Sequence, residues 1–134
     1  MLHRILSTIA VAFICIAASA QGVCVIKGNI ADDRMSDGSK IKKLTLTRTD
    51  ELGRTIEVAT AKVKKGKYTF KYELAKDEPV FMYAIKGFGE GNDVEVFVEP
   101  GEVLVAHRQG IKSIVSGTPS NDLYLEFYLT CDAE

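Results

Sequence analysis

The sequence predicts a mainly β fold, an antiparallel sandwich or open barrel of seven to eight strands with one C-terminal helix. Three observations predict it. Short runs of alternating apolar and polar residues follow one another along the chain, and turn residues separate them at intervals of about eight to twelve residues. A helical pattern appears only after residue 117, so the strands do not alternate with helices as a parallel α/β fold requires.

Residues 1–20 have the pattern of a secretory signal peptide. His3 and Arg4 precede an apolar run from Ile5 to Ala17, and small residues then lead to the cleavage expected before Gln21. The run is too short to span a bilayer, and bulky residues before the nearby cysteines disfavour lipid attachment. We therefore expect an exported protein, periplasmic, in the cell envelope or extracellular, whose residues 21–134 form a single β-sandwich domain ending in a short helix.

The charge of the chain provides no global field that would attract a polyanion. The formal net charge is −1, and it becomes −2 when the signal peptide is removed, because 16 Lys and Arg residues then face 18 Asp and Glu. Nonspecific binding to nucleic acid is therefore not expected. Basic residues predominate in 21–76 and acidic residues in 77–134, but a sheet places distant segments side by side, where the two halves can neutralise each other.

Four strands are predicted in the first half of the mature chain. The polar loop 31–40, which includes Asp32, Asp33 and Asp37, and a turn around Gly53 separate the first three. A hairpin turn is expected at Lys65-Gly66, because glycine takes the positive φ that such a turn needs. The expected strands are Val23–Ile30, Leu44–Thr47, Ile56–Lys64 and Lys67–Leu74.

The hairpin at Lys65-Gly66 predicts a register in which small residues face aromatic ones. This register places Tyr68 and Phe70 in the core and the lysines of the ribbon on a solvated face. The expected pairs are Val63 with Tyr68, Ala61 with Phe70 and Ala59 with Tyr72.

The second half of the chain is also built mostly of predicted strands. The segment Val80–Ile85 is apolar on both faces, which predicts a central strand that is covered from both sides and is among the most buried. The glycine-rich segment 87–93 is expected to be a flexible connection, and the proline and glycine of 99–102 suit a type II turn. The other expected strands are Val94–Val98, Val103–His107 and one around Ile114–Val115.

A helix is predicted after Gly117. Residues 118–122 supply helix-capping side chains, a proline suited to the first turn and an early acid. The helix would carry an apolar stripe that consists of Leu123, Tyr124, Phe127, Tyr128 and Cys131. We expect its leucine and phenylalanine to pack on the sandwich and Tyr124 and Tyr128 to stay partly exposed as an interaction surface, because tyrosine tolerates a half-wet environment.

Two cysteines remain after removal of the signal peptide. Cys24 and Cys131 lie near opposite ends of the mature chain, a spacing that is neither a redox motif nor a metal-ligand pattern. A disulfide between them would close a loop of about a hundred residues and add roughly 4 to 5 kcal/mol in the chain-entropy model. The alternative is two buried thiols, since each cysteine is in phase with apolar neighbours.

No residue set in the sequence predicts a catalytic, cofactor-binding or metal site. The only mature histidine, His107, is in phase with valines on a predicted strand and is expected in the core or at a strand end. The aspartates of 31–40 lack the alternation of a calcium loop. The acids after residue 89 have no tryptophan platform for a sugar, and the glycines of 87–91 lack the following helix of a phosphate loop.

The order of four segments resembles the domain-of-unknown-function 4369 family over nearly the whole mature chain. The segments are 25–30 (VIKGNI), 63–70 (VKKGKYTF), 96–101 (VFVEPG) and 116–118 (SGT) with Asn121-Asp122. The resemblance implies an exported β domain of Bacteroidetes-type bacteria, commonly placed before a thioredoxin-like thiol-disulfide oxidoreductase. It transfers no catalytic residue, and this sequence contains no CxxC motif.

Two functions follow as hypotheses. The first is a noncatalytic exported envelope module, an interaction or accessory domain that docks onto an unknown protein partner. The second is a truncated or split oxidoreductase, whose downstream thioredoxin-like catalytic domain is missing from this chain.

Overall fold

The computed structural model describes residues 22–30, 34–35, 38–89, 91–108 and 111–132. The predicted signal peptide and its cleavage site lie outside these residues, as do the loop aspartates Asp32, Asp33 and Asp37. The described elements are β1 (Val23–Asn29), β2 (Lys43–Thr49), β3 (Thr55–Lys62), β4 (Lys67–Glu73), β5 (Phe81–Lys86), β6 (Val94–Val98), β7 (Gly101–Arg108), β8 (Ile111–Ser116) and α2 (Pro119–Asp132).

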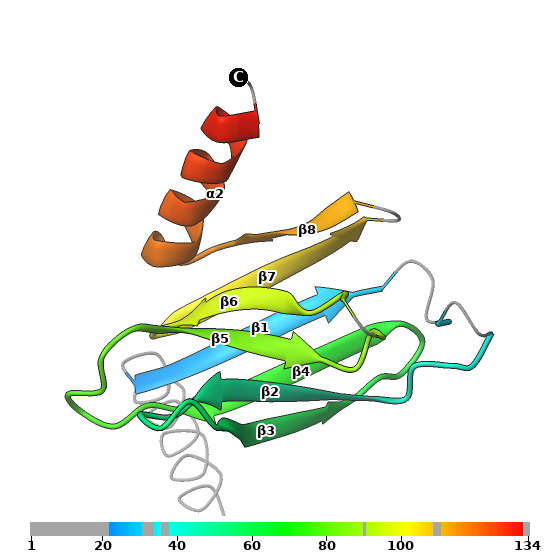
Figure 1. The fold of residues 1–134 in the computed structure, drawn as a ribbon, viewed down its shortest axis with the longest axis horizontal. Helices are drawn as coiled ribbons and strands as arrows, with labels where there is room; N and C mark the ends of the chain where they lie inside the picture. The colour runs from blue at the N-terminus through cyan, green and yellow to red at the C-terminus, as the bar shows by residue number, and fades with distance from the viewer. Residues whose placement is uncertain (1–21, 31–33, 36–37, 90, 109–110, 133–134) are drawn as a thin grey trace, which may run out of the picture.

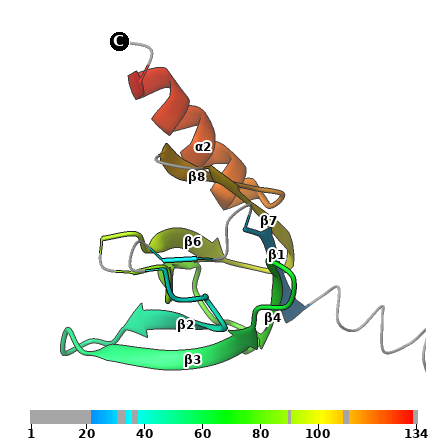
Figure 2. The same cartoon turned by 90° about the vertical axis from the view of Figure 1, so that its right-hand side faces the viewer.

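The strands form two four-stranded sheets, which confirms the mainly β, sandwich-like fold (Figure 1). One sheet has the order β4-β1-β7-β8 and the other has the order β3-β2-β5-β6. All pairs are antiparallel except β1 with β7, which run parallel. Consecutive strands β3 and β4 connect the sheets on one side, so β6 and β8 are left as the edge strands of the other side (Figure 2).

The turn at Lys65-Gly66 forms as predicted, but the register predicted for its strands is wrong. Lys65 and Gly66 have φ of 52° and 77°, and Lys64 and Lys67 exchange both backbone hydrogen bonds at 2.9 Å. Beyond this one pair the chain divides between the layers, because β4 pairs with β1 while β3 pairs with β2. The expected pairs Val63–Tyr68, Ala61–Phe70 and Ala59–Tyr72 are therefore not formed across a ribbon.

The strand β5 is less buried than its sequence predicts. It lies inside its sheet, between β2 and β6, yet Phe81 is 52% exposed and Met82 is 38% exposed. Only Tyr83 and Ile85 point into the core, where each is at most 3% exposed. The prediction of a strand covered on both faces is wrong because the second face of this sheet carries no packed layer among the described residues.

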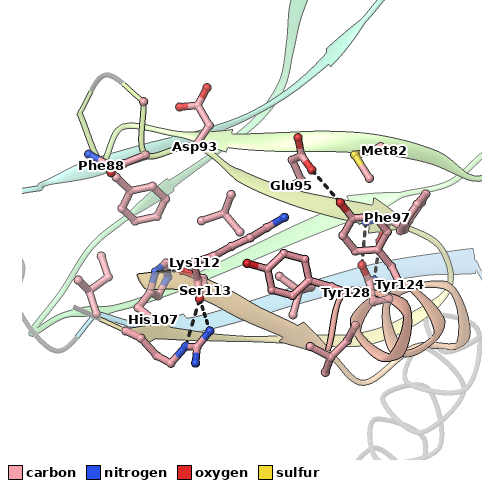
Figure 3. A pocket seen from close by; sticks show the side chains of 18 of the residues that line it. Met82, Phe88, Asp93, Glu95, Phe97, His107, Lys112, Ser113, Tyr124 and Tyr128 are labelled. Atoms are coloured by element: carbon pink, nitrogen blue, oxygen red, sulfur yellow. Dashed lines mark hydrogen bonds between the residues drawn. The ribbon is translucent and has the colours of Figure 1, made fainter. Parts of the chain in front are cut away.

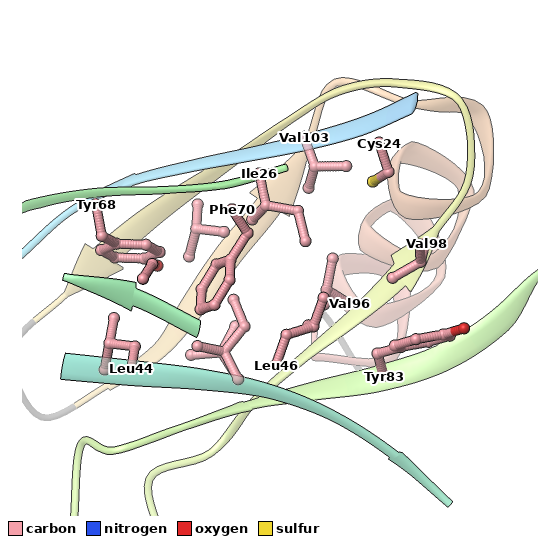
Figure 4. Close-up of a cluster of buried hydrophobic side chains, with 14 of the residues drawn as sticks. Cys24, Ile26, Leu44, Leu46, Tyr68, Phe70, Tyr83, Val96, Val98 and Val103 are labelled. Carbon is pink, nitrogen blue, oxygen red and sulfur yellow. The ribbon is translucent and has the colours of Figure 1, made fainter. Parts of the chain in front are cut away.

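The core lies between the two sheets and contains side chains from both (Figure 4). Phe70 and Ile26 come from one sheet and Leu46 and Ile85 from the other, and none of these four is exposed. The predicted core positions of Tyr68 and Phe70 are thus confirmed. The hairpin register from which they were predicted is not present, because β4 pairs with β1. The lysines around the turn are exposed, as expected.

Gly28 is required by the close approach of an aromatic ring to β1. A Cβ atom at this position would overlap with Cζ of Tyr68, far inside van der Waals contact. The ring of Tyr68 therefore packs directly over the backbone of its neighbouring strand. This contact explains the glycine in the segment 25–30.

No helix among the described residues is long and apolar enough to cross a membrane.

Candidate functional site

A cleft of about 670 Å³ opens between the edge strands β6 and β8 (Figure 3). The glycine-rich β5–β6 connection closes one end of it, and the first turns of α2 close the other. Apolar side chains such as Val94 and Val115 line its interior between the sheets. The cleft exists because the two sheets are connected on the β3–β4 side and are not paired with each other on this side.

Two tyrosines of α2 and a lysine of β8 form the helical end of the cleft. The ammonium of Lys112 lies 4.5 Å from the ring centroid of Tyr128 and 5.3 Å from that of Tyr124, both within the range of cation–π attraction. The ring of Tyr124 also contacts Phe97 edge to face, with the centroids 5.7 Å apart. Its hydroxyl lies 3.5 Å from a carboxylate oxygen of Glu95, which is a long contact.

His107 lies at the opposite end of the cleft, near the end of β7. Its Nε2 atom is 2.6 Å from the hydroxyl of Tyr68 and its Nδ1 atom is 3.2 Å from Oγ of Ser113. Phe88 packs on the imidazole, with the ring centroids 4.9 Å apart. His107 was expected either in the core or at a strand end, and the structure places it half-buried at a strand end.

At the histidine end, no carboxylate of the described residues contacts the imidazole of His107. Burial lowers the pKa of His107 and raises that of Tyr68, so both side chains are neutral near pH 7. In a Ser-His-Asp triad, a carboxylate stabilises the imidazolium that forms when the histidine accepts the proton of the serine. In the described structure the second partner of the ring is the hydroxyl of Tyr68, which cannot supply that charge.

The start of α2 is anchored on β6 by side chains that the sequence marked as caps and turn residues. Asn121, which is 2% exposed, accepts a hydrogen bond from the backbone N–H of Phe97 and donates to its carbonyl, both at 2.9 Å. This amide therefore replaces a strand partner at the β6 edge. Glu99 accepts two bonds of 2.7 Å from the backbone N–H and hydroxyl of Ser120.

The prediction that Leu123 and Phe127 pack on the sandwich is wrong, whereas Tyr124 and Tyr128 are partly exposed, as expected. Leu123 and Phe127 are 68% and 66% exposed, whereas Tyr124 and Tyr128 are half-buried against the cleft. The anchor at Asn121 fixes which face of the helix meets the sheets, and the tyrosines are on that face. The leucine and phenylalanine side, which we call the outer face of α2, is consequently the more exposed apolar side of the helix.

The structure places the two cysteines in different environments and leaves both as free thiols. Cys24 is buried in the core, where burial raises the pKa of its thiol, and Cys131 is exposed on α2. The disulfide is therefore not present in this structure. The expectation of two buried thiols holds for Cys24 and is wrong for Cys131, because the last turns of the helix extend beyond the sheets (Figure 1).

Sequence reasoning did not find the cleft. Its lining comes from segments far apart in the chain, and the pairing of Lys112 with Tyr124 and Tyr128 has no signature of local spacing. Among the described residues no group of three or more His, Cys, Asp or Glu side chains is arranged to hold a metal ion.

A protein-family model matches most of the chain. No curated protein and no solved structure matches the chain. The family model described as domain of unknown function (DUF4369) matches residues 24–124, which include β1 from its second residue, β2 to β8 and the anchored start of α2. The four segments that resemble the family contribute residues to contacts described above. These contacts are the packing of Tyr68 over Gly28, the turn at Gly66, and the Phe97–Asn121 anchor, which joins two of the segments. The chain belongs to the DUF4369 family.

Proposed function

We propose that this protein is a noncatalytic accessory module of the cell envelope that binds a protein partner through the outer face of α2. The exposed apolar side chains of that face are the observation that carries the proposal. Leu123 and Phe127 are four residues apart and point the same way, and each is about two-thirds exposed. Burying such a side chain contributes roughly 1.5 to 3 kcal/mol, so a covering partner gains several kcal/mol from this pair.

The helix is held in a form that suits recognition. Its first turn is fixed by Asn121 to β6 and by Ser120 to Glu99, the residue after β6, while the rest projects beyond the sheets (Figures 1 and 2). A helix fixed in this way loses little conformational freedom when a partner binds. Insertion of an amphipathic helix into an apolar groove uses anchors with this spacing.

The envelope location is supported by the signal-peptide pattern of residues 1–20. The noncatalytic role is supported by the neutral Tyr68–His107–Ser113 group and by the placement of the thiols. Cys24 is buried with a raised pKa and Cys131 has no second cysteine near it in the sequence, so neither has the setting of a redox-active thiol.

The outer face of α2 also suits a second candidate. In a truncated or split thiol-disulfide oxidoreductase, the thioredoxin-like domain implied by the family resemblance would cover Leu123 and Phe127. The coding sequence immediately downstream separates the two candidates, because a CxxC-bearing domain there would favour the second. Under either candidate function, an insulin-reduction assay on the purified chain should show no turnover.

Site-specific photo-crosslinking tests the proposed interaction. A benzophenone amino acid at position 127 of the full chain, expressed in cells that export it, should give one crosslinked adduct of defined mass. The matched control carries the same group at Leu52, which is 76% exposed on the β2–β3 turn, and should not give that adduct. Leu123→Lys in the chain labelled at 127 should abolish it. Equal adducts from both positions, or none from position 127, would refute the proposal.

A further inference from the structure

The cleft between β6 and β8 lies on the inner side of α2, away from the proposed docking face. Its volume of about 670 Å³ falls within the range of pockets that enclose small organic molecules. Such pockets are mostly apolar, with a few polar groups that orient the ligand. The cleft has this composition, because valines and aromatic rings line it and a small number of charged groups lie along its walls.

Aromatic rings at both ends of the cleft suit a flat apolar ligand. Phe88 lies at one end, and Tyr124 and Tyr128 lie at the other (Figure 3). Phe88 packs on His107, and burial lowers the pKa of this histidine, so both rings at this end of the cleft are uncharged near pH 7. A planar apolar body can therefore contact a ring at each end and the valines between the sheets.

The charged groups of the cleft favour an anion. Among the described residues, the cations on the wall formed by β7 and β8 are Arg108 and Lys112, and the acids on the opposite wall are Asp93 and Glu95. Lys86 pairs with Asp93 at 3.6 Å, whereas Glu95 makes no ion pair with another described residue. Arg108 and Lys112 thus outnumber the one unpaired acid of these two described walls, in a protein whose formal net charge is −1.

Arg108 and Lys112 are held in place by their neighbours. The guanidinium of Arg108 donates two hydrogen bonds to the carbonyl of Lys112, at 3.1 and 2.6 Å. The side chain of Lys112 extends across the cleft from β8 toward β6 and rests on the rings of Tyr124 and Tyr128 (Figure 3). No carboxylate of the described chain lies within ion-pair distance of its ammonium, which is therefore available to an incoming acid group.

We propose that the cleft between β6 and β8 binds a small aromatic anion, with the flat apolar body between Phe88 and the tyrosines of α2 and a single acid group on Lys112. The acid group can be a carboxylate or a sulfonate, since Lys112 acts as a point charge. Glu95, on the opposite wall, disfavours a ligand with a second negative group near the helix.

Two fluorescent probes that differ by one charged group test both parts of the proposal. The first is 8-anilino-1-naphthalenesulfonate, and the second is N-phenyl-1-naphthylamine, which has the same ring system without the sulfonate. Titration of the full chain with either probe should give saturable binding at one site. Lys112→Gln should weaken binding of the sulfonate about tenfold and change binding of the neutral probe less than twofold.

Matched variants make the result specific to the cleft. Lys71→Gln removes an exposed lysine on β4 and should leave both affinities unchanged. Tyr128→Ala removes one wall and should weaken both probes. Urea unfolding of each variant shows that its fold is intact. The proposal is overturned if neither probe binds saturably, if Lys112→Gln affects both probes equally, or if Lys71→Gln weakens the sulfonate as much as Lys112→Gln does.

Discussion

Replacing Asn121 by alanine should destabilise the domain by about 3 kcal/mol. The side chain makes three hydrogen bonds, two with the backbone of Phe97 at 2.9 Å and one to the hydroxyl of Thr118 at 2.7 Å. Each such bond contributes about 1 kcal/mol net. The site is 2% exposed, so water cannot readily replace the lost partner. In a domain of this size the loss corresponds to a fall in the thermal midpoint of roughly 10 to 20 °C.

Urea unfolding followed by circular dichroism measures this effect, and two further variants make it specific. Glu126→Ala, on the exposed side of the same helix, should leave the free energy of unfolding within about 0.5 kcal/mol of the original. Asn121→Asp keeps an acceptor for the N–H of Phe97 but places a carboxylate oxygen against its carbonyl, so it should not restore stability. If Asn121→Ala unfolds at the same urea concentration as Glu126→Ala, the amide does not anchor the helix to β6.

Three other perturbations test the fold and its pH dependence. Gly28→Ala should cost about 2 kcal/mol, because the new Cβ would overlap with Cζ of Tyr68; an unchanged urea midpoint would contradict that contact. Phe70→Ala should cost about 3 to 5 kcal/mol, since the ring is fully buried, and a smaller loss than for Gly28→Ala would be unexpected. Burial holds the pKa of His107 below its ordinary value, so the unfolded chain takes up this proton first as the pH falls. Stability from this group is complete above about pH 6.5 and declines below it, and urea midpoints between pH 7.5 and 5 should depend less on pH in His107→Asn.

The sequence predicted the elements well because their signals are local. The alternation in Val94–Val98 and the capping residues before α2 each depend on a few neighbouring residues, and both elements form where expected. The tight turn at Lys65-Gly66 is local too, and its positive φ angles are present. Which of the two sheets a strand joins is not a local property. The turn was therefore predicted correctly, but the pairing of β3 with β4 was not, since β3 pairs with β2 and β4 with β1.

The burial of β5 and the cleft depend on what the rest of the chain places nearby. The apolar run at Val80–Ile85 shows that both faces tolerate burial, but no element of the described residues packs on the outer one. Likewise, the cleft exists because β6 and β8 end their respective sheets without pairing with each other. A single sequence contains no short-range pattern for such an unpaired edge.

The two faces of α2 have roles opposite to those that their residue types suggest. Hydrophobicity alone would place Leu123 and Phe127 inward, and the anchor at Asn121 instead turns Tyr124 and Tyr128 toward the cleft. The tyrosines retain their polar tips in partly wet surroundings, while their rings contact Phe97 and the ammonium of Lys112. A geometric constraint at the first turn of the helix therefore overrides the preference of its exposed side chains.

This reversal predicts which substitutions on α2 the fold tolerates. Leu123→Lys and Phe127→Lys should each change the free energy of unfolding by no more than about 0.5 kcal/mol, because their side chains are already two-thirds exposed. Tyr124→Ala should cost about 1 to 2 kcal/mol, since it removes a ring contact and a cation–π contact. Urea unfolding of the three variants side by side measures the difference. A cost of 2 kcal/mol for Leu123→Lys, with none for Tyr124→Ala, would mean that the leucine side packs on the sandwich and that the outer face is not free to bind a partner.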